Sequence, residues 1–284
     1  MKKRRDLSIL LAGAIAFGMT GCGAAKTAET QSGAIADSTE ESTKTGTTEA
    51  ISQNGTGEQV LRVGMEGTYA PYTYHDDNGE LTGYEVDVAN AIGEKIGYQV
   101  EFVETEWDSM FEALDAGNFD VVMNQVTMTD ERKQKYDFST PYIFSTPVLI
   151  VAADNTDITS FDDVNGKKAA EGLTSNFNQI AQDYGAEIVG QDEFPLAMEC
   201  VLSGEADCAI NDKLTYAYWT KVKGDTTSTK IVAELDEPTE SGIVTEKGND
   251  ELLEKINGAI SELLADGTIS EISEKYFGTD ISNQ

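Results

Sequence analysis

From residue 60 onward, short apolar segments alternate along the chain with segments whose apolar residues recur at helical spacing. Residues 60–64 and 98–103 have the length and composition of strands, and between them Val86, Ala89 and Ile92 fall on one face of a helix. A chain that repeats strand and helix in this way buries its strands in sheets and covers the sheets with helices. The pattern therefore predicts an α/β fold.

A further strand is predicted over residues 119–125, where the sequence is nearly continuously apolar, and its end leads directly into a helix. Thr129 is a typical N-cap, which places Arg132 in the first helical turn. Free N–H groups at such a helix start attract anions, and a guanidinium can hold a carboxylate with two hydrogen bonds. The residues alone leave two interpretations of Arg132 open: a ligand for a carboxylate, or a surface charge beside Lys133 and Lys135.

Charge and composition decide against several classes of partner and chemistry. The chain carries 51 Asp and Glu residues against 20 Lys and Arg residues, a formal net charge of −31. Nucleic acids and anionic lipid surfaces bind clustered basic residues, so neither is expected as a partner. With one histidine and no close cysteine cluster, we expect no metal site and no cofactor. His75 beside Asp76 and Asp77 is interpreted as part of a solvated turn.

The first 21 residues are predicted to be a bacterial signal peptide. Four basic residues at positions 2–5 precede an apolar run over residues 7–19, which is too short to span a bilayer. The ending Met19-Thr20-Gly21-Cys22 resembles a lipobox, and this resemblance implies that Cys22 is the lipidated first residue of the mature protein, carrying palmitate. An ordinary secretory signal with an incidental cysteine is the alternative.

Residues 22–58 are predicted to be a disordered tether behind the lipidated cysteine. Of the 36 residues from 23 to 58, 17 are Ser, Thr or Gly and none is aromatic. Such a segment buries too little apolar surface to offset the entropy of ordering. We therefore expect an extracytoplasmic protein that is attached to the cell membrane only through its lipid.

Five stretches in order along residues 60–280 resemble the extracellular substrate-binding proteins of polar amino-acid ABC transporters (family 3). They cover residues 64–72, 83–89, 124–133 and 136–142, and Asp266-Gly267-Thr268 together with residues 274–278. The resemblance implies a two-lobed clamp of the type II periplasmic-binding-protein kind, with two hinge crossover strands. Lobe 1 is then discontinuous, residues 59–143 and 241–280, and lobe 2 is residues 144–240. An independent helix pattern at Leu252, Ile256 and Ile260 fits a segment that packs on a lobe formed earlier in the chain.

The same resemblance implies how each site residue contacts an amino acid in the cleft. Arg132 and Thr127 hold the α-carboxylate, and Asp212 takes the α-ammonium from the other lobe. The loop 172–176, which precedes a helix, offers its backbone N–H groups to the same carboxylate from the second lobe. Aromatic side chains form the walls, and an acid faces the far end of the ligand. The predicted ligand-binding residues are Glu66, Tyr69, Trp107, Gln125, Thr127, Arg132, Thr174, Ser175 and Asp212.

Ligand identity is predicted from the stretches around Glu66, Trp107 and Gln125, which look most like those of cystine-binding members. Cystine has two zwitterionic ends, so Glu66 can pair with the distal ammonium. A basic amino acid (arginine, lysine, histidine or ornithine) is the alternative ligand, and a cyclohexadienyl dehydratase on the same fold is the alternative class. We expect a monomeric binding protein rather than an enzyme, with an ABC transporter permease as its partner.

Two cysteines remain once Cys22 is assigned to lipid. Cys200 and Cys208 flank Gly204, one in a predicted helix and one in the following strand. Because both fall at core-facing positions, two separate buried thiols are favoured over a disulfide.

Overall fold

The computed structural model describes residues 59–283, so the predicted signal peptide, Cys22 and the tether lie outside the described residues. The chain divides into two units, 1–47 and 48–284, and every described residue belongs to the second. None of the helices between residues 59 and 283 combines the length and apolar composition that crossing a bilayer requires.

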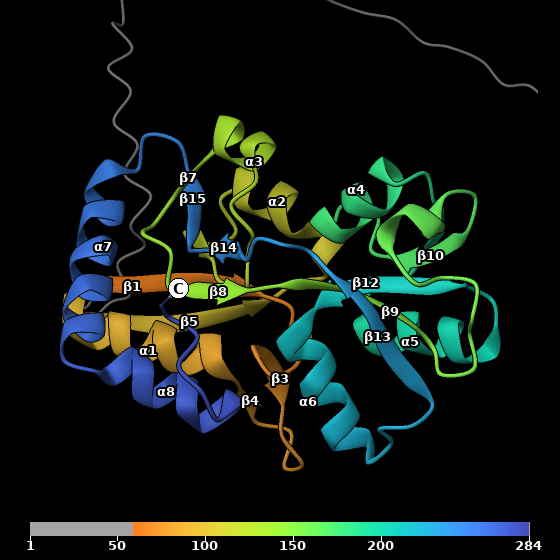
Figure 1. Cartoon of the computed structure of the whole chain (residues 1–284). Coiled ribbons are helices and arrows are strands. Elements are labelled where there is room, and N and C mark those ends of the chain that lie inside the picture. Colours follow the sequence, from red (N-terminus) through yellow and green to blue (C-terminus); the bar gives the residue numbers. More distant parts are fainter. Residues whose placement is uncertain (1–58, 284) are drawn as a thin grey trace, which may run out of the picture. The chain divides into compact units, whose positions relative to one another are not determined.

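The first of two five-stranded sheets has the strand order β5-β1-β6-β15-β7 (Figure 1). β1 pairs in parallel with β5 and β6, whereas β15 runs antiparallel between β6 and β7. Its strands are β1 (Gln59–Met65), β5 (Tyr98–Glu104), β6 (Val121–Val122), β7 (Tyr136–Phe138) and β15 (Val244–Glu246). β15 comes from a part of the chain more than 100 residues beyond the other four strands, so the sheet is completed late in the sequence.

Helices cover both faces of this first sheet. α1 and α8 lie on one side and α2 and α3 on the other (Figure 1), and α7 packs on α1. Successive β6 residues serve opposite faces, because Val121 joins the core under α1 and Val122 the core under α2. The helices are α1 (Tyr84–Ile96), α2 (Trp107–Asp115), α3 (Asp130–Lys135), α7 (Asp250–Ala265) and α8 (Thr268–Phe277).

The second five-stranded sheet has the order β11-β10-β12-β9-β13. β9 is buried along nearly its whole length, and its residues alternate between two cores: Val148 and Ile150 face α5, and Leu149 and Val151 face α4. The elements are β9 (Pro147–Ala152), β10 (Lys168–Glu171), β11 (Glu187–Gly190), β12 (Cys208–Asp212), β13 (Thr229–Glu234), the short 3₁₀ helix η1 (Phe161–Val164), α4 (Asn176–Asp183), α5 (Phe194–Ser203) and α6 (Lys213–Lys223).

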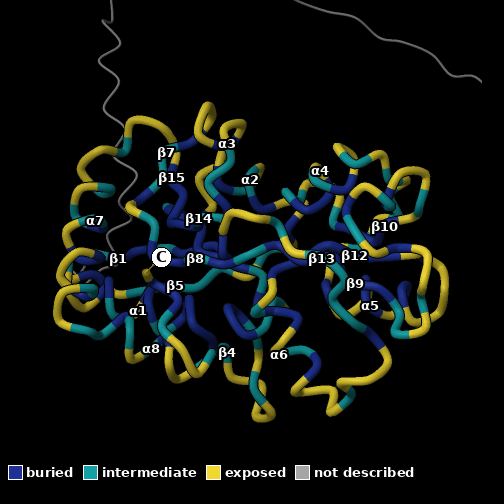
Figure 2. The backbone as a smooth tube through the Cα atoms, in the orientation of Figure 1, coloured by how far each residue is buried: buried dark blue, intermediate teal, exposed yellow. Residues whose placement is uncertain are grey.

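Two strands that pair with each other connect the sheets. β8 (Ile143–Ser145) leads from the first sheet to the second, and β14 (Thr239–Ser241) leads back, antiparallel to β8. A small three-stranded sheet of β2 (Thr68–Tyr69), β3 (Thr73–His75) and β4 (Leu81–Thr82) precedes α1. The buried residues concentrate in the strands of both large sheets, and exposed residues are found mainly in the loops and helix surfaces at the periphery, whereas the segment 123–127 after β6 is buried (Figure 2).

The α/β prediction is confirmed, but the strand predicted over residues 119–125 is wrong in length. Only Val121 and Val122 form β6, and the chain then turns, because the Asn124 side chain accepts the Glu66 N–H and Gln125 adopts a left-handed backbone with φ 52°.

The two cysteines of the described residues are free and buried, as expected, with Cys200 on α5 and Cys208 on β12.

Candidate ligand-binding site

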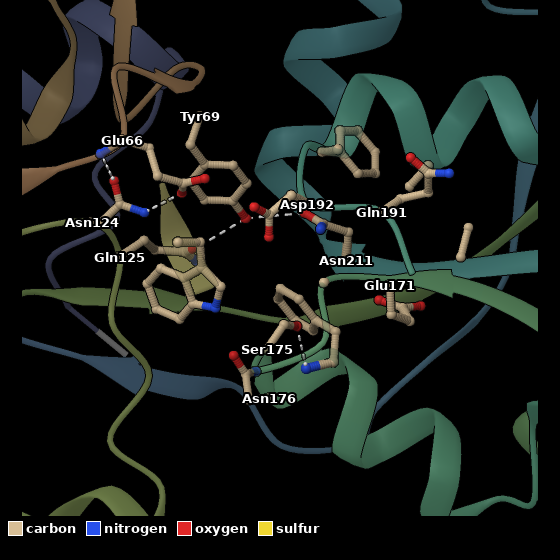
Figure 3. A pocket seen from close by; sticks show the side chains of 16 residues that line it. Glu66, Tyr69, Asn124, Gln125, Glu171, Ser175, Asn176, Gln191, Asp192 and Asn211 are labelled. Atoms are coloured by element: carbon tan, nitrogen blue, oxygen red, sulfur yellow. Dashed lines mark hydrogen bonds between the residues drawn. The ribbon is translucent and has the colours of Figure 1, made fainter. Parts of the chain in front are cut away.

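Two neighbouring hollows lie where the strands of both sheets end. The first, here called the acidic hollow, measures about 550 Å³ including its opening to solvent. The second, called the Arg132 hollow, is lined by Arg132, Thr127 and Thr174 among others. Ser175 and Asn176 line both hollows, so the two adjoin. Figure 3 shows the acidic hollow, whose lining residues are Glu66, Tyr69, Trp107, Asn124, Gln125, Ala170, Glu171, Gly172, Ser175, Asn176, Phe177, Gln191, Asp192, Phe194, Ala197 and Asn211.

Strand topology brings these side chains together. Glu66 directly follows β1, Asn124 follows β6, Glu171 ends β10, and Asn211 lies next to the end of β12. In an open α/β sheet the carboxyl ends of the parallel strands meet at one edge, which is where such folds bind ligands. The site therefore takes its walls from both sheets.

Arg132 is a buried cation whose hydrogen-bond partners are carbonyl groups. Thr129 caps α3 by accepting the Arg132 N–H, as predicted, and this cap sets the position from which the side chain extends. The guanidinium donates from Nη1 to Thr127 O at 3.1 Å and from Nη2 to Thr174 O at 3.4 Å. Within residues 59–283 it forms no ion pair, although it is only 9% exposed, and burial lowers its pKa to about 10.

Arg132 also stacks on aromatic rings. Its Cζ lies 5.2 Å from the centre of the Trp107 ring and 5.4 Å from that of Phe111. Trp107 is the first residue of α2 and part of the core cluster with Met110. The ring is both a core side chain and a wall of the acidic hollow.

Asp212 lies beside the acidic hollow but lines neither hollow. Its Oδ1 caps α6 by accepting the N–H groups of Leu214 and Thr215, and it accepts the Tyr72 hydroxyl as well. Its Oδ2 accepts Gln125 Nε2 at 2.8 Å. Burial raises the pKa of this carboxyl, and the hydrogen bonds oppose that rise. The structure thus brings Asp212 next to Gln125, whose side-chain amide occupies one of the two carboxylate oxygens.

Gln125 links several predicted residues. Its N–H donates to the buried carboxyl of Glu85 at 2.7 Å, and its Oε1 accepts the Tyr69 hydroxyl at 3.1 Å. The Tyr69 hydroxyl also lies 3.0 Å from Asn211 Oδ1. A non-glycine residue with a left-handed backbone is held there by its surroundings, and here Glu85 and Asp212 fix both ends of Gln125.

The loop before α4 differs from expectation. We expected the N–H groups of Thr174 and Ser175 to face an anion, but the Thr174 N–H and hydroxyl both donate to Asp108, at 3.1 and 2.7 Å. The Ser175 N–H donates to Gly172 O, and its hydroxyl caps α4 by accepting the Phe177 N–H. In this structure Thr174 therefore connects α2 with the second sheet, and Ser175 is a helix cap.

Glu66 is held by one neighbour. Asn124 Nδ2 donates to Glu66 Oε2, and Asn124 Oδ1 accepts the Glu66 N–H at 2.9 Å. Burial raises the pKa of Glu66 to about 7, and the Asn124 hydrogen bond opposes that rise.

Sequence reasoning missed six polar residues of the acidic hollow: Asn124, Glu171, Asn176, Gln191, Asp192 and Asn211. Glu171 is 3% exposed, and its Oε1 accepts the Ile210 N–H at 2.6 Å. Burial raises its pKa well above the ordinary value. The available signal was an acid at the carboxyl end of a short strand, Lys168–Glu171, which is the edge where an open α/β sheet presents ligand groups.

A family model, sequence relatives and solved structures all match this chain. A model of the bacterial extracellular solute-binding proteins, family 3, matches residues 61–279. The L-cystine-binding protein TcyA of Bacillus subtilis is 44% identical over 224 residues, 78% of this chain and 83% of that protein.

Solved structures share the fold. An ancestral arginine-binding protein bound to glutamine has a TM-score of 0.73 at 38% identity, covering 77% of this chain and 98% of that one. The L-cystine solute receptor of Neisseria gonorrhoeae, in its unliganded open conformation, has a TM-score of 0.55 at 45% identity, covering 79% of this chain and 95% of that one. The fold class expected from the sequence resemblance is confirmed.

The protonation of Glu66 is directly measurable. We expect its carboxyl to titrate near pH 7, because burial disfavours the charged form, and Asn124→Ala to raise the pKa further by removing the amide that stabilises the charge. Carbon-13 NMR of the labelled carboxyl in both proteins reports these values. A titration of wild type near the ordinary 4.5 would contradict the geometry described here.

Proposed function

Since this chain belongs to the bacterial extracellular solute-binding proteins, family 3, we propose that it captures an amino acid, with L-cystine as its ligand, and delivers it to an ABC importer. The observation that carries the proposal is Arg132: a buried guanidinium whose described partners are carbonyl groups, adjoining a hollow lined by carboxyl groups. A buried charge needs an opposite charge. An α-carboxylate on Arg132 and ammonium groups beside the acids supply both.

The proposed contacts follow the geometry. Arg132 and Thr127 hold the α-carboxylate, and Asp212 takes the α-ammonium once the Gln125 amide gives way to it. Tyr69 and Trp107 form the walls of the hollow, and Glu66 faces the far end of the ligand. Residues 59–143 with 241–280 act as one lobe and 144–240 as the other, with β8 and β14 as hinge strands.

Basic amino acids are the second candidate ligand class. The carboxyl groups of Glu66, Glu171 and Asp192 all line the acidic hollow, and a guanidinium or ammonium at the end of a side chain suits them as well.

Relatives named as binding proteins support capture without turnover, so we propose that the ligand leaves the cleft chemically unchanged. Mass spectrometry of cystine recovered after incubation with the protein tests this, and any new product would favour a dehydratase-like enzyme.

Replacing Arg132 tests the site assignment. Arg132→Ala should weaken every amino-acid ligand by about 2 to 5 kcal/mol, because the ligand carboxylate loses its buried partner. This corresponds to about 25-fold to several thousand-fold in dissociation constant. Titration calorimetry with cystine and arginine measures it, with Lys133→Ala, an exposed residue of the same helix that lines neither hollow, as the control. Unchanged binding by Arg132→Ala would show that the carboxylate is held elsewhere.

Glu66 should act selectively. Glu66→Gln removes a charge at the far end of the ligand, so it should weaken cystine and arginine by about 10-fold and leave serine almost unchanged. Glu94→Gln, which removes an exposed charge from α1, is the matched control. Equal losses for all three ligands in calorimetry would mean that Glu66 supports the fold of the site rather than its selectivity.

We also propose that the protein is a monomeric lipoprotein of the cell membrane, anchored through Cys22. The sequence resemblance to a lipobox supports this. Cys22→Ser should move the protein from the membrane fraction to the soluble fraction, because serine cannot carry the lipid that attaches the protein to the membrane. Immunoblots of fractionated cells measure the distribution. A variant that still sediments with the membrane would disprove anchoring through this residue.

A further inference from the structure

Glu85 is a buried acid that lies outside both hollows. It is the second residue of α1, it is fully buried, and it lines neither the acidic hollow nor the Arg132 hollow. Its carboxyl group accepts hydrogen bonds from two other parts of the chain: Oε1 accepts the Gln125 N–H at 2.7 Å, and Oε2 accepts the Tyr142 hydroxyl. No cation among residues 59–283 pairs with it. Burying an acid without an ionic partner is costly, so proteins seldom keep one without a use.

Tyr142 places one end of this contact at the strands that connect the two sheets. It directly precedes β8, and its N–H donates to Ser241 O, at the end of β14, at 3.2 Å. Its carbonyl accepts the Tyr84 hydroxyl at 3.1 Å, and the residue is fully buried. A displacement of β8 against β14 therefore reaches the Glu85 carboxyl group through Tyr142.

Gln125 places the other end of the contact on the segment that carries the site. Its left-handed backbone is one that a non-glycine residue adopts only when its surroundings hold it. A hydrogen bond from its N–H to an ionised carboxylate is stronger than one to a neutral acceptor. The Gln125 side chain donates to Asp212, and the chain then continues through Thr127 to Arg132. A change in the bond to Glu85 therefore shifts the start of the segment that leads to Arg132.

One carboxyl group thus joins the site segment to the connecting strands. We propose that Glu85 is a positioning residue that must be ionised for tight ligand binding, because its carboxylate holds Gln125 and Tyr142 together. This rests on the proposed function, in which Arg132 and Thr127 contact the ligand. An ionised carboxylate accepts hydrogen bonds at both oxygens, whereas a neutral carboxyl group carries a proton on one of them. Protonation therefore breaks one of the two bonds as they stand.

Burial brings this protonation into the physiological pH range. It raises the pKa of Glu85 to about 7, and the hydrogen bonds from Tyr142 and Gln125 oppose that rise. The titratable groups that face Glu85 are the phenols of Tyr84, on its own helix, and of Tyr142, while Asp212 contacts Gln125. Since the ionised form binds, affinity is highest above about pH 7 and falls as the pH drops through that value.

Titration calorimetry with serine tests this pH dependence, because serine has no distal charge that Glu66 could contact. For wild type we expect the dissociation constant to rise by up to about 10-fold from about pH 8 to about pH 6, as the ionised fraction of Glu85 falls. Glu85→Gln keeps an acceptor for the Gln125 N–H but does not titrate, so its profile should be flatter. Glu94→Gln, an exposed acid on the same helix, is the matched control. Parallel profiles for wild type and Glu85→Gln would overturn the proposal, because a purely structural residue changes affinity equally at every pH.

A second variant moves the pKa of Glu85 instead of removing the acid. Tyr142→Phe keeps the ring but deletes the hydroxyl that stabilises the carboxylate, so the pKa should rise and the loss of affinity should begin at a higher pH than in wild type. Tyr98→Phe, at a buried tyrosine of β5 whose hydroxyl accepts from Lys255, is the control. An unchanged pH profile for Tyr142→Phe would contradict the assignment.

Wild type alone supplies a third test, which does not depend on the folding of a variant. Linkage is reciprocal, so saturating serine must lower the Glu85 pKa by the factor by which protonation weakens binding. Carbon-13 NMR of the side-chain carboxyl group, with its signal assigned through the backbone, measures the pKa with and without serine. The same value in both samples would overturn the positioning role while amino-acid binding stands. If wild type binds neither serine nor cystine at any pH tested, the proposed function fails instead.

Discussion

The candidate site depends on one structural constraint: the returning chain holds the segment that carries Gln125, Thr127 and Arg132. Residues 240–242, at the end of β14 and directly after it, run beside this segment. Met128 N–H donates to Glu240 O at 2.9 Å, Gly242 N–H donates to Val126 O at 3.2 Å, and Thr127 forms a bridge with Ser241. A Cβ at position 242 would lie 2.3 Å from the Met128 methyl group and 3.1 Å from Ser139 Oγ, so a larger residue there would require the Met128 side chain to move. β15 then completes the first sheet between β6 and β7.

Because of this constraint, the site forms only after the chain has passed through the second sheet and returned. The strands that leave and return, β8 and β14, pair with each other and thereby place the end of β10 and of β12 near the end of β1. Side chains separated by more than 100 residues, such as Glu66 and Glu171, come to line one hollow. Such long-range pairing is entropically costly during folding, but it builds a site from two rigid sheets.

Electrostatics gives the site its chemical character. Arg132 is a buried cation without a carboxylate partner in the described chain, and the adjoining hollow is lined by carboxyl groups whose pKa values burial raises. Both arrangements are unfavourable in isolation, because burial without an opposite charge penalises the ionised form. Under the proposed function, one zwitterionic ligand supplies the opposite charge to both parts of the site.

The sequence by itself determined the local features of this protein. Strand and helix alternation predicted the α/β class, and the Thr129 cap with Arg132 in the first turn was predicted correctly because capping depends on neighbouring residues alone. Only the tertiary structure decided the rest. Through contacts between distant segments, Glu171 joined the hollow, Asp212 was engaged by Gln125, and the Trp107 N–H was buried with no acceptor among residues 59–283. Sequence spacing does not encode those contacts, because burial and hydrogen-bond partners are set by how the two sheets pack.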